Sequence, residues 1–194
     1  LEGDGIRKKT SLRASQLNQL VCAKIVDIYD DGTVANSRGS FKVDDEGTPG
    51  QKNHVVEQGM LRGYLWDYLN GKLTGNASTG NGRRTSYRDY PIPRMTNTYI
   101  GAGQTDPADI IASVKFGYYC KDMAGGSVNP ADGNFSFAVT EAYLIEDGKL
   151  SEATKNLTIT GNAADAMLNI ALVGNDLVMD TMTGTCGKEG QYKH

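Results

Sequence analysis

Apolar and polar side chains alternate along much of this chain, and the alternation predicts strands for most of the regular structure. Two tight turns are predicted between neighbouring strands, because Gln58-Gly59 and Asp147-Gly148 match the two-residue loops that close antiparallel hairpins. A largely antiparallel sheet follows from these hairpins. The predicted strands cover residues 21–29, 54–57, 60–64, 97–101, 114–120, 135–145, 150–159 and 177–179.

Three segments have helical spacing instead. Leucines at positions 65, 69 and 73 share one face of a helix over 66–73, which Gly75 can end. Asp106 followed by Pro107 is typical of an N-cap and the first helical residue. Asn162 is predicted to cap a helix that runs to residue 173. The elements together predict an α+β fold, with a largely antiparallel β-sheet and two or three short helices.

Size and charge fit one soluble unit. The 194 residues suffice for a single domain over 1–194, and no linker separates two cores. No apolar run is long enough to cross a bilayer. The 20 basic and 23 acidic residues give a net charge of -3, which provides no general attraction to nucleic acid or to an anionic membrane. We therefore expect neither nucleic acid nor a membrane among the partners.

The three cysteines are widely spaced and form no C-x-x-C pair, so neither a disulfide framework nor a zinc knuckle is expected. A reducing, cytoplasmic location fits this pattern best. Cys22 lies in a predicted strand and is expected to pack as a small core residue. Cys186 differs, because small residues flank it and leave its thiol approachable.

Two polar clusters lie in the first half of the chain. Acidic residues 44–46 lack the alternating ligands and closing glutamate of a calcium loop, so a solvated turn is predicted there. The glycine-rich loop over 74–84 ends in Arg83 and Arg84, and backbone N–H groups beside forked guanidinium groups suit a phosphate or a carboxylate. The loop lacks the G-x-x-x-x-G-K-[ST] pattern of nucleotide binding. Ordering around a peptide carboxylate or a partner is therefore favoured.

The residues by themselves encode no finished active site. A cysteine nucleophile at Cys186 needs a histidine base, and the sequence offers only His54 and the terminal His194. His54 falls on a predicted strand with no second histidine nearby and is interpreted as structural. A zinc site needs at least two further ligands besides Cys186, and no H-x-x-x-H spacing supplies them.

Five segments form a specific pattern when they are taken in order along nearly the whole chain. They are 43–49 (VDDEGTP), 79–84 (TGNGRR), 93–99 (PRMTNTY), 141–146 (EAYLIE) and 186–191 (CGKEGQ). Together they resemble the C-terminal part of members of the TldD/PmbA family, also named modulator of DNA gyrase or peptidase U62.

The resemblance implies a zinc metallopeptidase that acts on unfolded or small peptides. In this family, two histidines of an H-E-x-x-x-H helix and the cysteine matching Cys186 hold the catalytic zinc. A Gly-Leu-Glu-Gly-Asp-like sequence follows that helix almost at once, and this chain begins at residues 1–4 with Leu-Glu-Gly-Asp. We therefore expect the chain to begin just after the helix, to contribute Cys186 and to lack both histidines and the catalytic glutamate. It is expected to hold no catalytic residue, to bind no zinc alone and to be inactive alone.

The resemblance also implies partners and substrate contacts. The domain is expected to supply a sheet against which an extended peptide pairs, with Asn81, Arg83 and Arg84 contacting that substrate. Family members act as a TldD–PmbA-like heterodimer or as homodimers, so a PmbA-like subunit or a second copy is expected. One alternative is a non-catalytic, PmbA-like subunit that binds peptide without cleaving it. Another is a regulator of a DNA enzyme, which the acidic charge balance disfavours.

Overall fold

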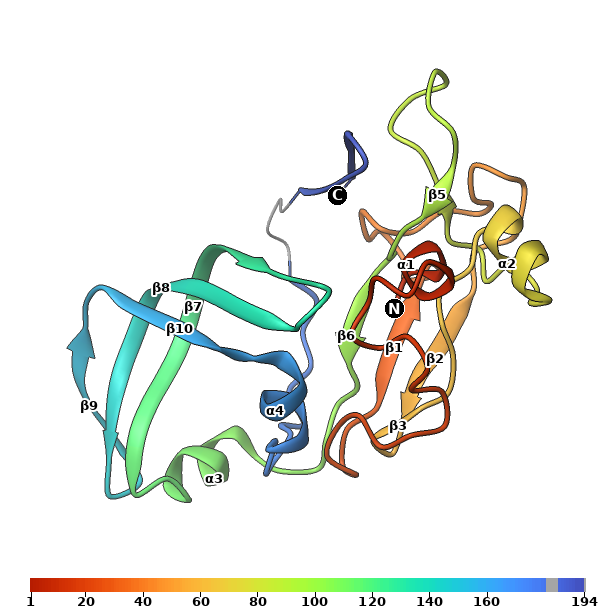
Figure 1. Cartoon of the computed structure of the whole chain (residues 1–194). Coiled ribbons are helices and arrows are strands. Elements are labelled where there is room, and N and C mark those ends of the chain that lie inside the picture. The colour runs from red at the N-terminus through yellow and green to blue at the C-terminus, as the bar shows by residue number, and fades with distance from the viewer. Residues whose placement is uncertain (181–184, 194) are drawn as a thin grey trace. The chain divides into compact units, whose positions relative to one another are not determined.

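The computed structural model describes residues 1–180 and 185–193, and the chain divides into two compact units (Figure 1). One unit comprises Leu1–Gly101 with Met179–His194, and the other comprises Ala102–Val178. Each unit contains its own antiparallel sheet. The single domain expected over 1–194 stays a prediction. Among the described residues, no helix has the length and apolar character needed to cross a membrane.

The main sheet of the first unit has four antiparallel strands in the order β3-β2-β1-β6. Strands β2 and β3 form the predicted hairpin, because Gln58 and Gly59 both have positive φ, 46° and 76°, as the tight turn requires. This hairpin prediction is confirmed. The strands are β1 (Ile28–Asp31), β2 (Lys52–Glu57), β3 (Met60–Leu61) and β6 (Thr98–Ile100).

The strand predicted over 21–29 is largely wrong, because only its last two residues belong to β1. The backbone N–H groups of Val21 and Cys22 both donate to the carbonyl of Gly59, and Val26 closes a turn. The segment therefore packs around the β2–β3 turn instead of extending along a neighbouring strand. Val21, Cys22 and Val26 are all buried, which confirms that Cys22 packs in the core.

Short elements border this sheet. The helix predicted over 66–73 is confirmed as α2. The side chain of Asp67 caps its start by accepting a hydrogen bond from Asn70 N at 2.9 Å, and Gly75 ends it with φ 75°. Its leucines at 69 and 73 are 56% and 61% exposed, so this face does not join the core. The elements are α1 (Gly3–Arg7), α2 (Tyr68–Thr74), the paired β4 (Gly82–Arg83) and β5 (Ile92–Pro93), and the paired β11 (Cys186–Lys188) and β12 (Gln191–Lys193).

The second unit is a sheet built around the 13-residue strand β8. Strand β7 pairs with one edge of β8, while β9 and β10 pair with successive parts of the other edge. Asp147 and Gly148 close the predicted β8–β9 hairpin with φ values of 46° and 75°. Asn156, with φ 58°, interrupts the strand predicted over 150–159, which is therefore two strands. The strands are β7 (Phe116–Val128), β8 (Asn134–Glu146), β9 (Lys149–Thr154) and β10 (Leu157–Asn162).

Both helices of the second unit begin at the predicted caps. The side chains of Asp106 and Asn162 each accept a hydrogen bond from the backbone N–H two residues ahead, at 2.8 and 3.0 Å. The helices are α3 (Pro107–Ala112) and α4 (Ala163–Leu168), so the second is shorter than predicted. The strand predicted over 177–179 is wrong, because these residues pair with no strand in the described part of the chain. The α+β fold class, with largely antiparallel sheets and short helices, is confirmed.

A wholly buried carboxylate, Asp30 on β1, joins separate segments of the first unit. It accepts hydrogen bonds from Asn81 Nδ2 at 2.7 Å, from N and Oγ1 of Thr96 at 2.8 and 2.9 Å, and from Thr98 Oγ1 at 2.6 Å. Asn81 in turn donates from Nδ2 to the carbonyl of Arg94 and accepts from Arg94 N at its own carbonyl, both at 2.9 Å. A buried charge is tolerated when it is bonded this fully. The network thereby fixes the backbone of Arg94 relative to the sheet.

We predict that Asn81→Ala lowers the free energy of unfolding by about 2–3 kcal/mol, because the buried Asp30 carboxylate then lacks a donor. Chemical denaturation of the protein measures this loss. Asn76 is exposed after α2 and provides a matched control, for which Asn76→Ala changes stability by less than about 0.5 kcal/mol. Equal losses for the two variants would contradict a stabilising role for the Asp30 network.

Candidate functional site

Cys186 lies exposed on β11, in a hairpin closed by Glu189 and Gly190 with φ values of 50° and 74°. Gly187 pairs across this hairpin with Tyr192, and a Cβ atom at Gly187 would lie 2.9 Å from Cε1 of that tyrosine. The glycine next to the cysteine therefore leaves room for an aromatic ring. The thiol itself is accessible, as the sequence predicts.

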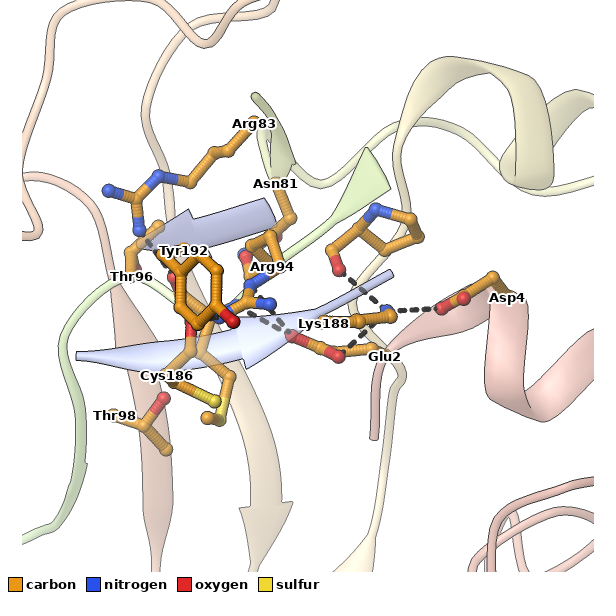
Figure 2. A network of polar contacts seen from close by, with 12 residues as sticks. Glu2, Asp4, Asn81, Arg83, Arg94, Thr96, Thr98, Cys186, Lys188 and Tyr192 are labelled. Atoms are coloured by element: carbon orange, nitrogen blue, oxygen red, sulfur yellow. Dashed lines mark hydrogen bonds and ion pairs between the residues drawn. The ribbon is translucent and has the colours of Figure 1, made fainter. Parts of the chain in front are cut away.

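Lys188 anchors the strand of Cys186 to the first residues of the chain. Its Nζ donates to Glu2 Oε2 at 2.8 Å, to Asp4 Oδ1 at 2.6 Å and to the carbonyl of Pro93 at 3.0 Å (Figure 2). An ammonium group has three N–H donors, so each one finds an acceptor. The side chains of Lys188 and Asp4 are 20% and 9% exposed, and solvent therefore screens their ion pair less than a surface pair.

A second set of polar contacts holds the other strand of the hairpin. Gln191 is buried, donating from Nε2 to the carbonyl of Tyr90 at 2.9 Å and accepting from Thr85 N at 3.0 Å. Thr85 and Tyr192 exchange two hydrogen bonds, each 2.9 Å long, between the threonine hydroxyl and the tyrosine backbone. Directional bonds therefore hold both strands of the hairpin to other segments of the first unit.

Arg94 reaches the main chain of the cysteine directly. Its Nη2 donates to the carbonyl of Cys186 at 2.8 Å, and its Nε lies 3.7 Å from Glu2 Oε1. Glu2 consequently faces both Arg94 and Lys188, and Figure 2 shows the three side chains together at the hairpin. The cysteine strand is thus held from two sides by positively charged groups that share one carboxylate.

The residues expected to contact substrate differ in exposure. Asn81 is wholly buried in the Asp30 network. Arg83 is buried on β4, where its Nη1 donates to the carbonyl of Met95 at 2.6 Å and its guanidinium lies over the ring of Phe41. Arg84 is partly exposed, with its Nε 3.8 Å from Asp45 Oδ1.

The acidic cluster is only in part the solvated turn that the sequence predicts, because Asp45 is exposed whereas Asp44 is not. Asp44 is buried, and its carboxylate accepts from the backbone N–H groups of Glu46, Thr48 and Gly82 at 2.8–3.0 Å. Glu46 Oε2 accepts from Tyr68 N, the first residue of α2, at 2.7 Å. Burial is the main reason that the pKa of Glu46 is raised above its ordinary value. The cluster therefore ties the β4 segment and α2 to one turn.

Residues 1–188 of this chain match the family model of the PmbA/TldA metallopeptidase C-terminal domain. The chain belongs to this family. Its architecture agrees, because solved structures of family relatives superpose on most of it. They include TldE from Thermococcus kodakarensis, with a TM-score of 0.82 and 30% identity, covering 93% of this chain and 41% of that one. A Thermotoga maritima protein described as a modulator of a DNA gyrase gives a TM-score of 0.83 at 25% identity, covering 92% and 41%.

Curated relatives of this C-terminal domain are named metalloproteases. The Metalloprotease TldD homolog of Buchnera aphidicola subsp. Acyrthosiphon pisum is 49% identical over 191 residues, and that of Haemophilus influenzae is 46% identical over 191 residues. Each alignment covers 98% of this chain. The chain spans 40% of the length of each of these relatives.

The family's name implies a metal ion, for which Cys186 is the candidate donor in this C-terminal domain. No three His, Cys, Asp or Glu side chains cluster as a metal site within residues 1–180 and 185–193. A catalytic zinc ion needs three protein ligands, so these residues do not form a complete site. Cys186 suits one position because its thiol is exposed. His54 lies on β2 with Nε2 2.9 Å from Asp27 Oδ1 and its ring stacked on Tyr29, which agrees with a structural role, while His194 is outside the described residues.

Sequence reasoning missed the residues that hold Cys186 in place. In the sequence, Glu2 and Asp4 mark only the beginning of the chain, and Arg94 and Lys188 stand only within segments that resemble the family. A basic residue two positions after Cys186 is an available signal, because residues i and i+2 of a strand lie on the same face of it. Nothing local in the sequence indicates that Arg94 is buried.

We predict that Lys188→Met speeds hydrogen exchange at the β11 amides about tenfold, which corresponds to about 1.4 kcal/mol of lost local stability. The reason is that Glu2 and Asp4 lose the ammonium group that ties them to the hairpin. Mass-spectrometric hydrogen exchange of the protein measures the effect. Lys24 is exposed and provides the control, since Lys24→Met leaves β11 exchange unchanged. Identical exchange in the two variants would show that Lys188 does not anchor the hairpin.

Proposed function

We propose that this chain is the C-terminal part of a zinc-dependent metallopeptidase that cuts unfolded or small peptides, with Cys186 as one zinc ligand. The observation that carries the proposal is the anchor formed by Lys188 on the strand of Cys186. Its Nζ donates to Glu2 Oε2 at 2.8 Å and so holds this strand beside the first residues of the chain. Family membership and relatives named metalloproteases supply the reaction class.

The other ligands are expected from residues that precede Leu1 in a longer protein. The position of Leu1 is itself anchored, because Leu65 N donates to its carbonyl at 3.0 Å and Gly3 N donates to the carbonyl of Leu65 at 2.7 Å. A helix leading into Leu1 rises about 1.5 Å per residue, so its last two turns lie within about 11 Å of that point. Two histidines on one face of that helix and the Cys186 thiolate would form a three-ligand site with an open fourth position.

Bound in such a site, zinc would supply the activation of a water molecule for attack on a peptide carbonyl. The chain's own residues bind and orient: Cys186 contributes a thiolate, while Lys188 and Arg94 hold its strand in place. An exposed strand edge offers backbone hydrogen bonds to an extended peptide. Arg84, with Asn81 and Arg83 beneath the surface, is proposed to face that peptide.

We further propose a cytoplasmic protein that works as a dimer, with either a PmbA-like subunit or a second copy. The alternative function is a non-catalytic, PmbA-like subunit that binds peptide without cleaving it. The exposed Cys186 supports the peptidase instead, because a subunit without zinc has no use for this ligand. An H-E-x-x-x-H motif in the residues that precede Leu1 distinguishes the two.

We predict about one zinc ion per chain in the full-length protein and the loss of most of it in Cys186→Ser, because a serine hydroxyl is a poor substitute for a thiolate ligand. Atomic absorption after dialysis measures the metal content. Cys120→Ser, on β7 in the second unit, is the control and keeps its zinc. Equal zinc in the wild type and in Cys186→Ser would refute the assignment of this ligand.

We predict that the double variant Arg83→Ala with Arg84→Ala lowers kcat/KM for peptide cleavage by the full-length protein about tenfold or more, because charge-assisted bonds to the peptide are lost. Thermal unfolding is measured alongside, since Arg83 is buried. The single Arg84→Ala variant lowers kcat/KM with little change in Tm, whereas Arg88→Ala, at an exposed arginine nearby, changes neither. Unchanged cleavage by the double variant would exclude both arginines from the substrate site.

A further inference from the structure

Arg94 carries a buried hydrogen-bond donor that finds no acceptor within residues 1–180 and 185–193. The residue is 4% exposed, its Nη2 donates to the carbonyl of Cys186, and its Nε faces Glu2. Its Nη1 is buried and has no hydrogen-bond partner among the described residues. Because a guanidinium group has five N–H donors, two of them remain unused on this one nitrogen.

An unused buried donor is destabilising. It costs about 1–3 kcal/mol, and more when the group is charged, so folded proteins rarely keep one. The neighbouring carboxylates are already engaged: each oxygen of Asp30 accepts two hydrogen bonds, and Glu2 accepts from Lys188. The missing acceptor is therefore expected from outside the described residues.

The rigid guanidinium places this donor beside the cysteine. Nη1 and Nη2 lie in one plane on the same carbon atom, and Nη2 is fixed on the carbonyl of Cys186. Figure 2 shows the side chain of Arg94 at the strand that carries Cys186. The guanidinium group of Arg83 lies close enough to Arg94 for the two positive charges to interact. Burial, as the larger cause, and the charge of Arg94, as the next, both lower the pKa of Arg83. An oxygen atom with full or partial negative charge is the acceptor that suits these surroundings.

We propose that Arg94 Nη1 binds an oxygen atom of the peptide substrate beside Cys186, either a backbone carbonyl oxygen or the C-terminal carboxylate. This inference rests on the proposed peptidase function, which supplies the peptide. The bound peptide would provide the acceptor that the described residues lack, so this hydrogen bond forms when the substrate is in place. Arg94 therefore has two tasks, since Nη2 holds the cysteine strand and Nη1 positions the peptide.

Peptide binding by the metal-free, full-length protein tests the proposal independently of cleavage. The probe is a fluorescently labelled unfolded peptide that the metal-loaded wild type cleaves, and anisotropy gives its Kd. Arg94→Gln raises Kd about tenfold or more. Arg94→Lys keeps the charge but loses the planar fork, so its Kd rises similarly. Arg62 is exposed and pairs with Glu57, and Arg62→Gln is the control with unchanged Kd.

Peptides altered at a single oxygen identify the acceptor. Thioamide analogues replace one backbone carbonyl oxygen by sulfur, a weaker acceptor, and a C-terminal amide removes the terminal carboxylate. One of these changes weakens binding to the wild type about tenfold and leaves binding to Arg94→Gln unaffected. A thioamide with this behaviour identifies a carbonyl acceptor, and the terminal amide identifies the carboxylate.

The inference is overturned if no altered peptide binds the wild type more weakly, or if each loss is equal in the wild type and the Arg94 variants. The wild-type scan needs no substitution, so it decides even where an Arg94 variant fails to fold. Failure of the proposed function looks different. Zinc content that does not depend on Cys186, or a wild type that binds no peptide, rejects the peptidase and this inference with it. If zinc binding and cleavage are intact but no altered peptide shows a loss of binding that depends on Arg94, only the inference about Arg94 is rejected.

Discussion

One buried carboxylate constrains the polar framework of the first unit. Asp30 has no exposed surface, and its two oxygens accept four hydrogen bonds from Asn81, Thr96 and Thr98. Taking a carboxylate out of water costs several kcal/mol unless each lone pair finds a donor. The two segments that carry these donors can therefore occupy only one position against β1. The choice of amide and hydroxyl side chains in these segments follows from that single charge.

The position of the candidate metal ligand follows from the same constraint. Asn81 links the Asp30 carboxylate to the backbone of Arg94, and the side chain of Arg94 bonds to the carbonyl of Cys186. Just before Arg94, the carbonyl of Pro93 accepts from Lys188, the same ammonium group that holds Glu2. Each link is a hydrogen bond of 3.0 Å or less between groups of fixed geometry. A continuous series of hydrogen bonds thus joins the Asp30 network to the cysteine strand.

The features that the sequence predicts depend on neighbouring residues, whereas those that it does not predict depend on contacts between distant segments. The Gln58-Gly59 turn is predictable because two adjacent residues determine its positive φ values. The strand expected over 21–29 fails because its backbone bonds go to a distant turn, and Asp44 is buried because it collects N–H groups from two segments. Cys186 was identified through resemblance to a family, not through its spacing. The role of Arg94 was not predictable, since it depends on contacts with residues more than 90 positions away.

Polar attachment suits a strand that carries the proposed metal ligand. The hairpin of Cys186 is held by Lys188, Arg94 and Gln191, while Tyr192 stays 64% exposed. Apolar packing stabilises without direction, whereas charge-assisted hydrogen bonds fix both distance and angle. A metal ligand must be held to within a fraction of an ångström, so directional bonds meet this need even where desolvation of their charges cancels much of their energy. In this view the buried ions at the hairpin serve the geometry of the thiol more than the stability of the fold.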